Sequence, residues 1–295
     1  MFSISPKSLL QRLNLRPKKT LGQNFLVHVH QARRIVAALE LSGDDTVVEI
    51  GAGLGALTVF LAQEARRVVA VERDPALARF LQEELFAKAT QVEVHCQDVL
   101  RFDFLEFSRQ VGRPLAVTGN LPYQITSPLL FKLMAERQAV SRAVLMMQQE
   151  VGARLLAKAG TKDYGILSVL LRYHFAVQRL FSLGPANFYP PPQVDSVVVK
   201  LTPAAPSPAA LDPDLLARVV KAAFGQRRKT LNNALIAQAA HFGLSSEQLR
   251  ACFGELGIDP GRRGETLDLA EFVALSNKIT ETSRQEAKGP RRRTF

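Results

Sequence analysis

The residues best suited to chemistry lie in one short segment, Asn120-Leu121-Pro122-Tyr123. The Asn120 side-chain oxygen and a main-chain carbonyl at Leu121 or Pro122 offer two acceptors for the N–H bonds of an exocyclic amine. Pro122 fixes its own φ and favours extended geometry at Leu121, which would set the acceptors in advance. Tyr123 can stack on a flat base, worth roughly 1–3 kcal/mol. The segment predicts a site for an amino group on a heterocycle; the alternative is a turn in which Tyr123 only packs.

A strand, a glycine-rich turn, a helix and a second strand follow one another between residues 46 and 72. The turn is Gly51-Ala52-Gly53-Leu54-Gly55, and the second strand ends at Glu72, 21 residues after Gly51. In such units the glycines let the backbone approach a ligand, and the acid accepts from ribose hydroxyls. The nicotinamide fingerprint has its third glycine three positions after the second, whereas Gly55 is two after Gly53. This spacing favours S-adenosylmethionine, which has no pyrophosphate to seat on the helix N-terminus.

Two further predicted strands bring polar residues to the same edge of the sheet. Residues 92–95 lead to Asp98, and residues 114–118 lead to Asn120. Asp98 can accept from the amino group of the cofactor's adenine, or it can be a helix cap or loop acid. Because ligands bind beyond the carboxyl ends of strands in open α/β sheets, we expect these strand ends to form one site.

The remaining pattern is also α/β. The sequence predicts strands at 46–50, 68–71, 92–95, 114–118, 143–148 and 197–201, helices at 30–41, 56–65 and 150–158, and an apolar stretch at 166–175. Residues 187–196 contain three consecutive prolines, which fix φ and remove donors, so no regular structure is expected there. This loop can present Phe188 as a second stacking face, or it is only a connection.

Charge is distributed unevenly along the chain. The net charge is +11, of which residues 1–39 carry +7, residues 40–200 carry none and residues 201–295 carry +4. Basic ends on a neutral body predict a polyanion held by the flanks; the alternative is solvated tails. No apolar run reaches the roughly 18 residues of a membrane span, so a protein without membrane association is expected.

Cysteine and histidine usage indicates neither disulfides nor a metal. Cys96 and Cys252 are far apart and lack metal-ligand spacing, which favours a reducing, cytoplasmic compartment. His28 and His30 alternate in what reads as a short extended segment, and we expect no metal site there.

Four segments are predicted from these patterns. They are a basic N-terminal extension (1–19), a Rossmann-like α/β domain (20–204), a smaller all-α C-terminal domain (205–283) and a basic tail (284–295). Residues 1–19 also have the composition of an organelle transit peptide. Asp212-Pro213 predicts a helix start, and Ser245 with Gln248 predicts a capping box. The residues predicted to bind RNA phosphates are Lys18, Lys19, Arg227, Arg228 and Lys229.

The chain resembles the ribosomal RNA adenine N6,N6-dimethyltransferases, and specifically their bacterial small-subunit type. The resemblance covers residues 16–280 and rests on five motifs in order: residues 22–26, 49–55, 120–123, 188–196 and 226–231. It implies S-adenosylmethionine contacts at Asn24, Leu26, Gly51, Gly53, Glu72, Asp98 and Asn120. It also implies a target-adenine site formed by Asn120, Leu121, Pro122, Tyr123 and Phe188.

The implied activity is S-adenosylmethionine-dependent N6,N6-dimethylation of two adjacent adenines near the 3′ end of small-subunit rRNA, without a metal. The implied substrate is rRNA within a 30S assembly intermediate, and the expected protein is a cytoplasmic monomer. Three alternatives stay open: a large-subunit rRNA methyltransferase of the macrolide-resistance type, a ribosome-assembly or transcription factor that mainly binds nucleic acid, and a DNA adenine methyltransferase.

Overall fold

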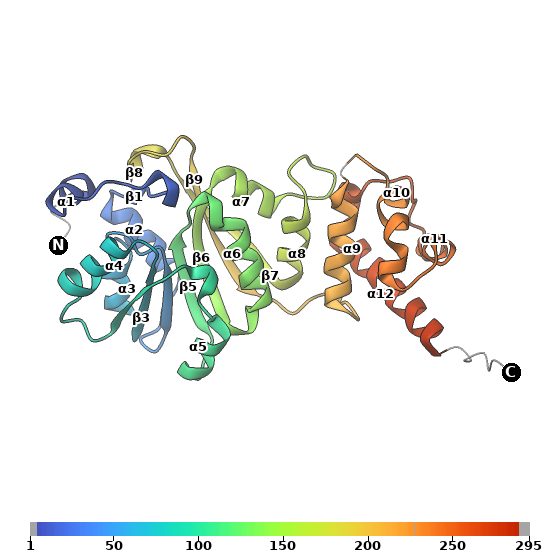
Figure 1. The fold of residues 1–295 in the computed structure, drawn as a ribbon, viewed down its shortest axis with the longest axis horizontal. Helices are drawn as coiled ribbons and strands as arrows, with labels where there is room; N and C mark the ends of the chain where they lie inside the picture. The colour runs from blue at the N-terminus through green and yellow to red at the C-terminus, as the bar shows by residue number, and fades with distance from the viewer. Residues whose placement is uncertain (1–4, 227, 289–295) are drawn as a thin grey trace. The chain divides into compact units, whose positions relative to one another are not determined.

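The chain forms two compact units in the computed structural model, which describes residues 5–226 and 228–288 (Figure 1). The first unit contains the chain up to Ala153 and Phe175–Pro203, and the second contains Arg154–His174 and the chain from Ala204 onward. The segment Arg154–His174 therefore groups with the C-terminal helices, whereas the sequence divides the chain only near residue 204. No helix in the described part of the chain combines the length and apolarity needed to cross a membrane.

A seven-stranded sheet organises the first unit, in the order β4-β3-β2-β5-β6-β9-β7. Its strands are β2 (Thr46–Ile50), β3 (Arg67–Glu72), β4 (Val92–Cys96), β5 (Leu115–Asn120), β6 (Val140–Gln148), β7 (Phe175–Leu183) and β9 (Ser196–Pro203). The first five strands in this order, β4 to β6, each pair in parallel with the next, and β9 runs antiparallel to both β6 and β7. The carboxyl ends of β2 to β5 thus meet at one edge, as the sequence predicts.

Helices pack on both faces of this sheet (Figure 1). The first unit contains α1 (Pro6–Arg12), α2 (Val29–Ala37), α3 (Thr58–Glu64), α4 (Pro75–Phe80), α5 (Phe104–Val111), α6 (Tyr123–Ala135) and the start of α7 (Gln149–Leu156). Val68 of β3 packs in one core cluster with Ile35 of α2 and Leu61 of α3. Arg67, which alternates with it, lies over the Phe107 ring of α5 at 5.0 Å, and so α5 covers the opposite face.

All six predicted strands are confirmed, but β7 was not predicted. The pairing of β7 with β9 shifts register between Arg179 and Phe181, which breaks the alternation of apolar and polar residues. The expectation of no regular structure at 187–196 is wrong at its start. There β8 (Phe188–Tyr189) pairs antiparallel with β1 (Phe25–Leu26) in a separate two-stranded sheet.

The N-terminal segment contains a helix where the sequence suggests only a basic extension. Helix α1 begins after Ser5, whose hydroxyl accepts from the Ser8 N–H at 3.1 Å, with Pro6 in its first turn and Leu10 buried. The expectation of an extended segment at His28 and His30 is also wrong. His28 precedes α2 as its N-cap residue, and His30 lies within that helix.

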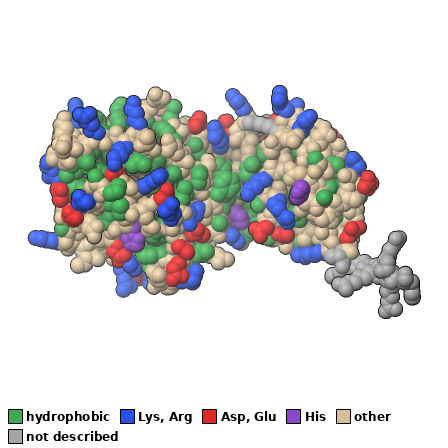
Figure 2. All heavy atoms as spheres, viewed as in Figure 1, with side chains coloured by type: hydrophobic (Ala, Val, Ile, Leu, Met, Phe, Trp, Pro, Cys, Tyr) green, Lys and Arg blue, Asp and Glu red, His purple; other side chains and the backbone are tan. Residues whose placement is uncertain are grey.

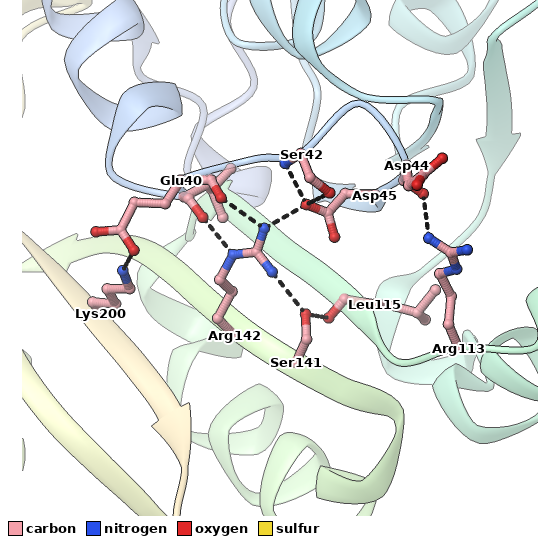
Figure 3. A network of polar contacts seen from close by, with 10 residues as sticks. Glu40, Ser42, Asp44, Asp45, Arg113, Leu115, Ser141, Arg142 and Lys200 are labelled. Atoms are coloured by element: carbon pink, nitrogen blue, oxygen red, sulfur yellow. Dashed lines mark hydrogen bonds and ion pairs between the residues drawn. The ribbon is translucent and has the colours of Figure 1, made fainter.

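Arg142 ties three segments together at the amino ends of the strands (Figure 3). Its guanidinium donates to the carbonyl oxygens of Leu39 and Glu40 and to the Asp45 carboxylate, the last at 2.6 Å. The Glu40 carboxylate pairs in turn with Lys200 of β9 at 2.7 Å. These contacts fix the loop between α2 and β2 to β6 and β9, at the end of the sheet opposite the strand ends described below.

The second unit is helical. It contains the end of α7, α8 (Ile166–His174), α9 (Pro213–Gly225), α10 (Leu231–Leu235), α11 (Ser246–Glu255) and α12 (Leu269–Lys288). The predicted starts are confirmed: Asp212 caps α9 through the Leu215 N–H, and Ser245 and Gln248 form a capping box on α11. Phe253 of α11 and Phe272 of α12 are buried in the core of this unit.

Candidate functional site

An open cavity lies at the carboxyl ends of β2, β3, β4 and β5. Six of the residues predicted to bind the cofactor line it: Asn24, Gly51, Gly53, Glu72, Asp98 and Asn120. The seventh, Leu26, is buried in β1 and lines an adjoining smaller cavity. Residues from five separate segments of the chain are thus brought together as the sequence predicts.

The glycine turn and Glu72 form one side of this cavity. Gly53 has φ +59°, and a Cβ there would lie 3.3 Å from the Phe25 ring, so a larger residue would be strained. The Glu72 carboxylate accepts from the N–H groups of Gly53 and Asp74, both at 2.8 Å. Burial raises the pKa of Glu72, although these hydrogen bonds oppose the change. Each carboxylate oxygen keeps acceptor capacity for a hydroxyl donor in the cavity.

Asp98 has the cap role that the sequence leaves open for it, and its position is compatible with the acceptor role. Its Oδ1 accepts from the Leu100 N–H at 3.0 Å and so caps a short 3₁₀ turn. The same side chain lines the cavity, and its Oδ2 lies 3.5 Å from the Arg73 guanidinium. A cap and a ligand acceptor are compatible because the two oxygens of one carboxylate serve separate donors.

Asn120 ends β5 at the junction of two cavities. Its Nδ2 donates to the Asn24 carbonyl oxygen at 2.8 Å. A carbonyl can only accept, so the contact fixes the orientation of the amide and leaves Oδ1 as the acceptor for a ligand.

The main-chain acceptor can also be assigned. The Pro122 carbonyl already accepts from the Thr126 hydroxyl at 3.0 Å and from the Ile125 N–H at 3.2 Å, at the start of α6. The Leu121 N–H donates to the Met146 carbonyl at 2.8 Å, which fixes this segment to β6. Of the two carbonyls that the sequence offers, Leu121 is therefore the better placed to accept from a substrate amine.

A second, smaller cavity also borders Asn120. Leu121, Tyr123, Phe188 and Pro192 are among its lining residues. Tyr123 is 38 % exposed, whereas Phe188 is only 4 % exposed and packs in a core cluster with Leu26. Tyr123 can therefore stack on an incoming ring, and Phe188 forms part of the cavity wall rather than an exposed face.

The two-stranded sheet connects the cofactor cavity with this second cavity. Leu26 of β1 is paired with Phe188 of β8, and Phe25 with Tyr189. The Val27 N–H continues the pairing by donating to the Asn187 carbonyl at 2.8 Å. Backbone hydrogen bonds therefore join the segment that carries Asn24 to the proline-rich loop.

Lys18 anchors the N-terminal segment beside the cofactor cavity. Its ammonium lies 2.8 Å from Oδ1 of Asp74, and Gln23 donates to Oδ2 at 3.0 Å. Burial would raise the pKa of Asp74, but hydrogen bonds from Lys18 and Gln23 hold it below its ordinary value. Lys19, the other predicted phosphate contact here, is exposed.

Basic residues of the second unit lie on neighbouring loops. Arg228 and Lys229 are exposed between α9 and α10, and Arg227 lies outside the described residues. The Leu231 N–H donates to the Arg262 carbonyl at 2.7 Å, which brings this loop beside the exposed Arg263. Arg263 is not among the phosphate contacts predicted above, although the Arg262-Arg263 pair was a usable signal in the sequence. Figure 2 shows basic side chains spread over the drawn face of both units, with acidic ones among them.

One further polar residue near the cofactor cavity, Glu49, is not among the predicted site residues. Glu49 occupies the fourth position of β2 and is 2 % exposed. An acid within an otherwise apolar, β-branched strand was the signal available in the sequence. Across residues 5–226 and 228–288, no cluster of three or more His, Cys, Asp or Glu has an arrangement that could hold a metal ion.

Sequence comparison finds a match over most of the chain. The family model described as ribosomal RNA adenine dimethylase matches residues 14–280. The ribosomal RNA small subunit methyltransferase A of Geobacter metallireducens is 46% identical over 267 residues, which cover 90% of this chain and 96% of that protein. The protein of the same name from Geobacillus thermodenitrificans is 43% identical over 279 residues, covering 92% and 94%.

Solved structures give a consistent result. A dimethyladenosine transferase from Plasmodium falciparum superposes with a TM-score of 0.76 at 26% identity, covering 87% of this chain and 98% of that one. The 23S rRNA methyltransferase ErmE superposes with a TM-score of 0.65 at 25% identity, covering 87% and 100%.

Proposed function

Because the chain belongs to the ribosomal RNA adenine dimethylase family, we propose that it dimethylates N6 of two adjacent adenines near the 3′ end of small-subunit rRNA. The methyl donor is S-adenosylmethionine, and the first unit has the Rossmann-like fold of methyltransferases that use it. The observation that carries the proposal is the position of Asn120. This residue lines both the cofactor cavity and the smaller cavity beside Tyr123.

The residues of the larger cavity fit S-adenosylmethionine. Glu72 offers acceptors for ribose hydroxyls, and Asp98 offers an acceptor for the adenine amino group. The left-handed backbone at Gly51 and Gly53 keeps side chains out of the space in front of β2. When bound, S-adenosylmethionine supplies an electrophilic methyl group carried on a sulfonium. The residues proposed to hold it are Asn24, Leu26, Gly51, Gly53, Glu72, Asp98 and Asn120.

The chemistry requires the target amine to be held and aimed. The nitrogen lone pair of adenine N6 is delocalised into the ring, so N6 is a poor nucleophile. Oδ1 of Asn120 and the carbonyl of Leu121 can accept from its two N–H bonds, which directs the nitrogen toward the cofactor cavity. Tyr123 stacks on the base, and Phe188 limits its position from the cavity wall.

Positioning supplies most of the acceleration in this mechanism. Holding reactants in attack geometry can contribute about 7–11 kcal/mol in favourable cases. No strong general base is required, because the N6 proton becomes acidic only as the new N–C bond forms. The target adenine must leave its stack, at a cost of a few kcal/mol that is smaller where the RNA is already open.

The finer features of the activity are part of the same proposal. The substrate is rRNA within a 30S assembly intermediate, and the enzyme acts as a cytoplasmic monomer without a metal. Arg227, Arg228 and Lys229 bind RNA phosphates, together with Lys19 and the part of Lys18 that stays exposed. Phosphate contacts of this kind position the substrate without reading its sequence.

The decisive experiment is transfer of labelled methyl from S-adenosylmethionine to undermethylated small subunits, large subunits and duplex DNA in parallel. The expected product is N6,N6-dimethyladenosine in the small subunit alone. Label in the large subunit would replace the proposal with the resistance-type activity. Label in duplex DNA at a comparable rate would favour a DNA methyltransferase. Donor binding with no transfer to any substrate would favour a nucleic-acid-binding factor.

One observation keeps the large-subunit activity as the second candidate. The 23S rRNA methyltransferase ErmE superposes over 87% of this chain. The relatives at 43–46% identity carry the small-subunit name, and the 25% identity to ErmE is much lower.

A further inference from the structure

The outer face of helix α2 is basic. His30, Arg33 and Arg34 are exposed there, whereas Ile35 and Val36 are buried in the core of the first unit. The three exposed residues are separated by three and four positions along the chain, which places them on one face of a helix. The function proposed above gives no role to any of them.

Aromatic rings hold the two guanidinium groups of this face. The guanidinium carbon of Arg34 lies 3.6 Å from the centre of the Phe181 ring on β7. That of Arg33 lies 5.2 Å from the centre of the Phe60 ring on α3. Stacking covers one plane of a guanidinium and leaves its N–H edge accessible to a ligand. Both groups are therefore oriented before a ligand binds.

The charge of this face is not neutralised. Among residues 5–226 and 228–288, neither Arg33 nor Arg34 forms an ion pair with a carboxylate. The sequence contains no Asp or Glu before Glu40, and Glu40 pairs with Lys200 at 2.7 Å. Lys18, by contrast, is already paired with an acid, as described above. A basic surface without internal acid partners is complementary to a polyanion.

The basic face begins beside the smaller cavity, which is proposed to hold the target base. His28 precedes α2, and its ring lies 5.4 Å from that of His30. The N–H of Val27 donates to the carbonyl of Asn187, and the next residue, Phe188, lines the cavity. The two arginines follow within two helical turns, about 11 Å along the axis. A strand that leaves the cavity on this side can therefore continue along α2.

We propose that the outer face of α2 binds the phosphate backbone of the substrate rRNA next to the target adenine, with Arg33 and Arg34 as the phosphate contacts. Each guanidinium can donate two parallel hydrogen bonds to one phosphate. Such contacts position RNA without reading its sequence. The inference rests on the proposed function for the identity of the polyanion. It adds an RNA-binding surface in the first unit to the basic loop proposed in the second.

Filter binding of the full-length protein to small-subunit rRNA over a salt series tests the surface. The double variant Arg33→Gln with Arg34→Gln should reduce the slope of log affinity against log salt by about two. Arg66→Gln with Arg109→Gln is the matched control, because it removes the same charge from two exposed arginines that lie beside acids. This control should keep the wild-type slope. An unchanged slope in the α2 variant, or equal reductions in both variants, would overturn the proposal.

Phe181→Leu tests the stacking separately from the charge. This variant keeps both arginines, so the salt slope should equal that of the wild type. Affinity for rRNA should still fall by about 2- to 5-fold, because the Arg34 guanidinium loses the ring that orients it. Wild-type affinity in Phe181→Leu would overturn the orienting role of the ring.

Further measurements identify the ligand of this face and check the fold. Calorimetry of S-adenosylmethionine binding without RNA should give the same affinity for the wild type and the double α2 variant, as expected if the variant is folded. Loss of self-association, or of binding to vesicles of anionic lipid, with an unchanged rRNA slope would overturn the proposal in favour of a second copy or a membrane. Methyl transfer to small subunits with an unchanged slope would contradict only this inference. A reduced slope without transfer to any substrate would contradict only the proposed activity.

Discussion

At the residue scale, the two ends of the Asn120 amide have different tasks. The NH₂ group is bound to the Asn24 carbonyl within the protein, which leaves the oxygen for a substrate amine. Substitution by Ala removes the oxygen and leaves the backbone of β5 in place. The substitution also removes the bond to the Asn24 carbonyl, so donor affinity has to be measured beside the rate of transfer.

Asn120→Ala should lower the rate of methyl transfer to small subunits by about 100- to 1000-fold, the usual loss when one positioned polar group is removed from a reacting centre. Donor affinity should change much less, because six other residues are proposed to hold the donor. Single-turnover rates and calorimetric affinities would be compared with those of Gln110→Ala, an exposed amide on α5. A rate within a few-fold of wild type would contradict the role assigned to Asn120.

Glu49 also makes stability depend on pH. Its pKa is about 8 in the folded protein against an ordinary value of 4.5, so the unfolded chain loses this proton first as the pH rises. The free energy of unfolding should therefore fall between about pH 4.5 and pH 8, by an amount on the order of 4 kcal/mol from this residue. Glu49→Gln stays neutral and should show a flatter profile. Urea unfolding of both proteins at pH 5 and pH 8 measures the difference, which should vanish if Glu49 ionises normally when folded.

The sequence predicts the residues of the site better than it predicts their surroundings. Asn120, Glu72 and Asp98 could be placed because each follows a recognisable strand, and strand ends converge in a parallel sheet. The burial of Phe188 could not be predicted, because it results from pairing with Leu26, which is more than 150 residues away in the sequence. Similarly, the choice between the Leu121 and Pro122 carbonyls depends on a bond from Thr126 that forms only once α6 exists.

At the scale of elements, the N-terminal segment forms part of the first unit. Lys18 and Gln23 both bind the Asp74 carboxylate, and Thr20–Phe25 line the cofactor cavity. Asp74 also caps α4 by accepting from the Ala76 N–H at 3.1 Å. One buried carboxylate therefore holds a wall of the cofactor cavity and the start of a helix together.

Lys18→Met should weaken donor binding by roughly 3- to 10-fold, because Lys18 holds a wall of the cavity through Asp74 and a typical hydrogen bond contributes about 0.5–1.5 kcal/mol. Lys19→Met is the matched control, because it removes one positive charge from an exposed neighbour. Calorimetry of S-adenosylmethionine binding without RNA separates the two. Equal donor affinity in both variants would contradict a role of Lys18 in donor binding.

Helix α1 and strand β7 show what sequence patterns omit at this scale. Helix α1 has only seven residues, and in the described structure it depends on burial of Leu10 and on the Ser5 cap. The amino-acid composition of this segment shows that it is basic, but it does not show the burial of Leu10 or the cap at Ser5. Strand β7 is an edge strand with many exposed positions, so its sequence lacks the continuous apolar run of the central strands.

At the scale of the whole molecule, the uneven distribution of charge predicts how RNA binding responds to salt. The net charge of +11 is concentrated in residues 1–39 and 201–295. Affinity for rRNA should therefore fall steeply as ionic strength rises, since bound phosphates release counterions.

Lys229→Gln should reduce the slope of log affinity against log salt by about one, the amount expected for one lost phosphate contact. Lys88→Gln, an exposed lysine in the neutral part of the chain, should leave the slope unchanged. Filter binding to small-subunit rRNA over a salt series measures both. Identical slopes for the two variants would return Lys229 to an ordinary solvated surface residue.

The division of the chain into units could be predicted only in part. The linker composition near residue 204 indicates a boundary there, and the second unit does resume at Ala204. Nothing in the sequence of residues 154–174 separates them from the strands on either side. Their grouping depends on contacts with later helices, such as the Gly160 N–H donating to the Glu265 carbonyl at 2.7 Å.

The pairing of β1 with β8 has a thermodynamic consequence. Strand β1 carries Leu26, from the segment proposed to hold the donor. Strand β8 carries Phe188, which lines the smaller cavity beside Tyr123. Ordering one strand orders the other, so the methyl donor and the rRNA should bind with positive cooperativity. Reciprocity then requires that the donor raises RNA affinity by the same factor by which RNA raises donor affinity. Affinities measured around the closed cycle with S-adenosylhomocysteine would give this factor, and a factor of one would show independent sites. Neither ligand would then have to bind first, and the complete complex would be favoured over both half-occupied ones.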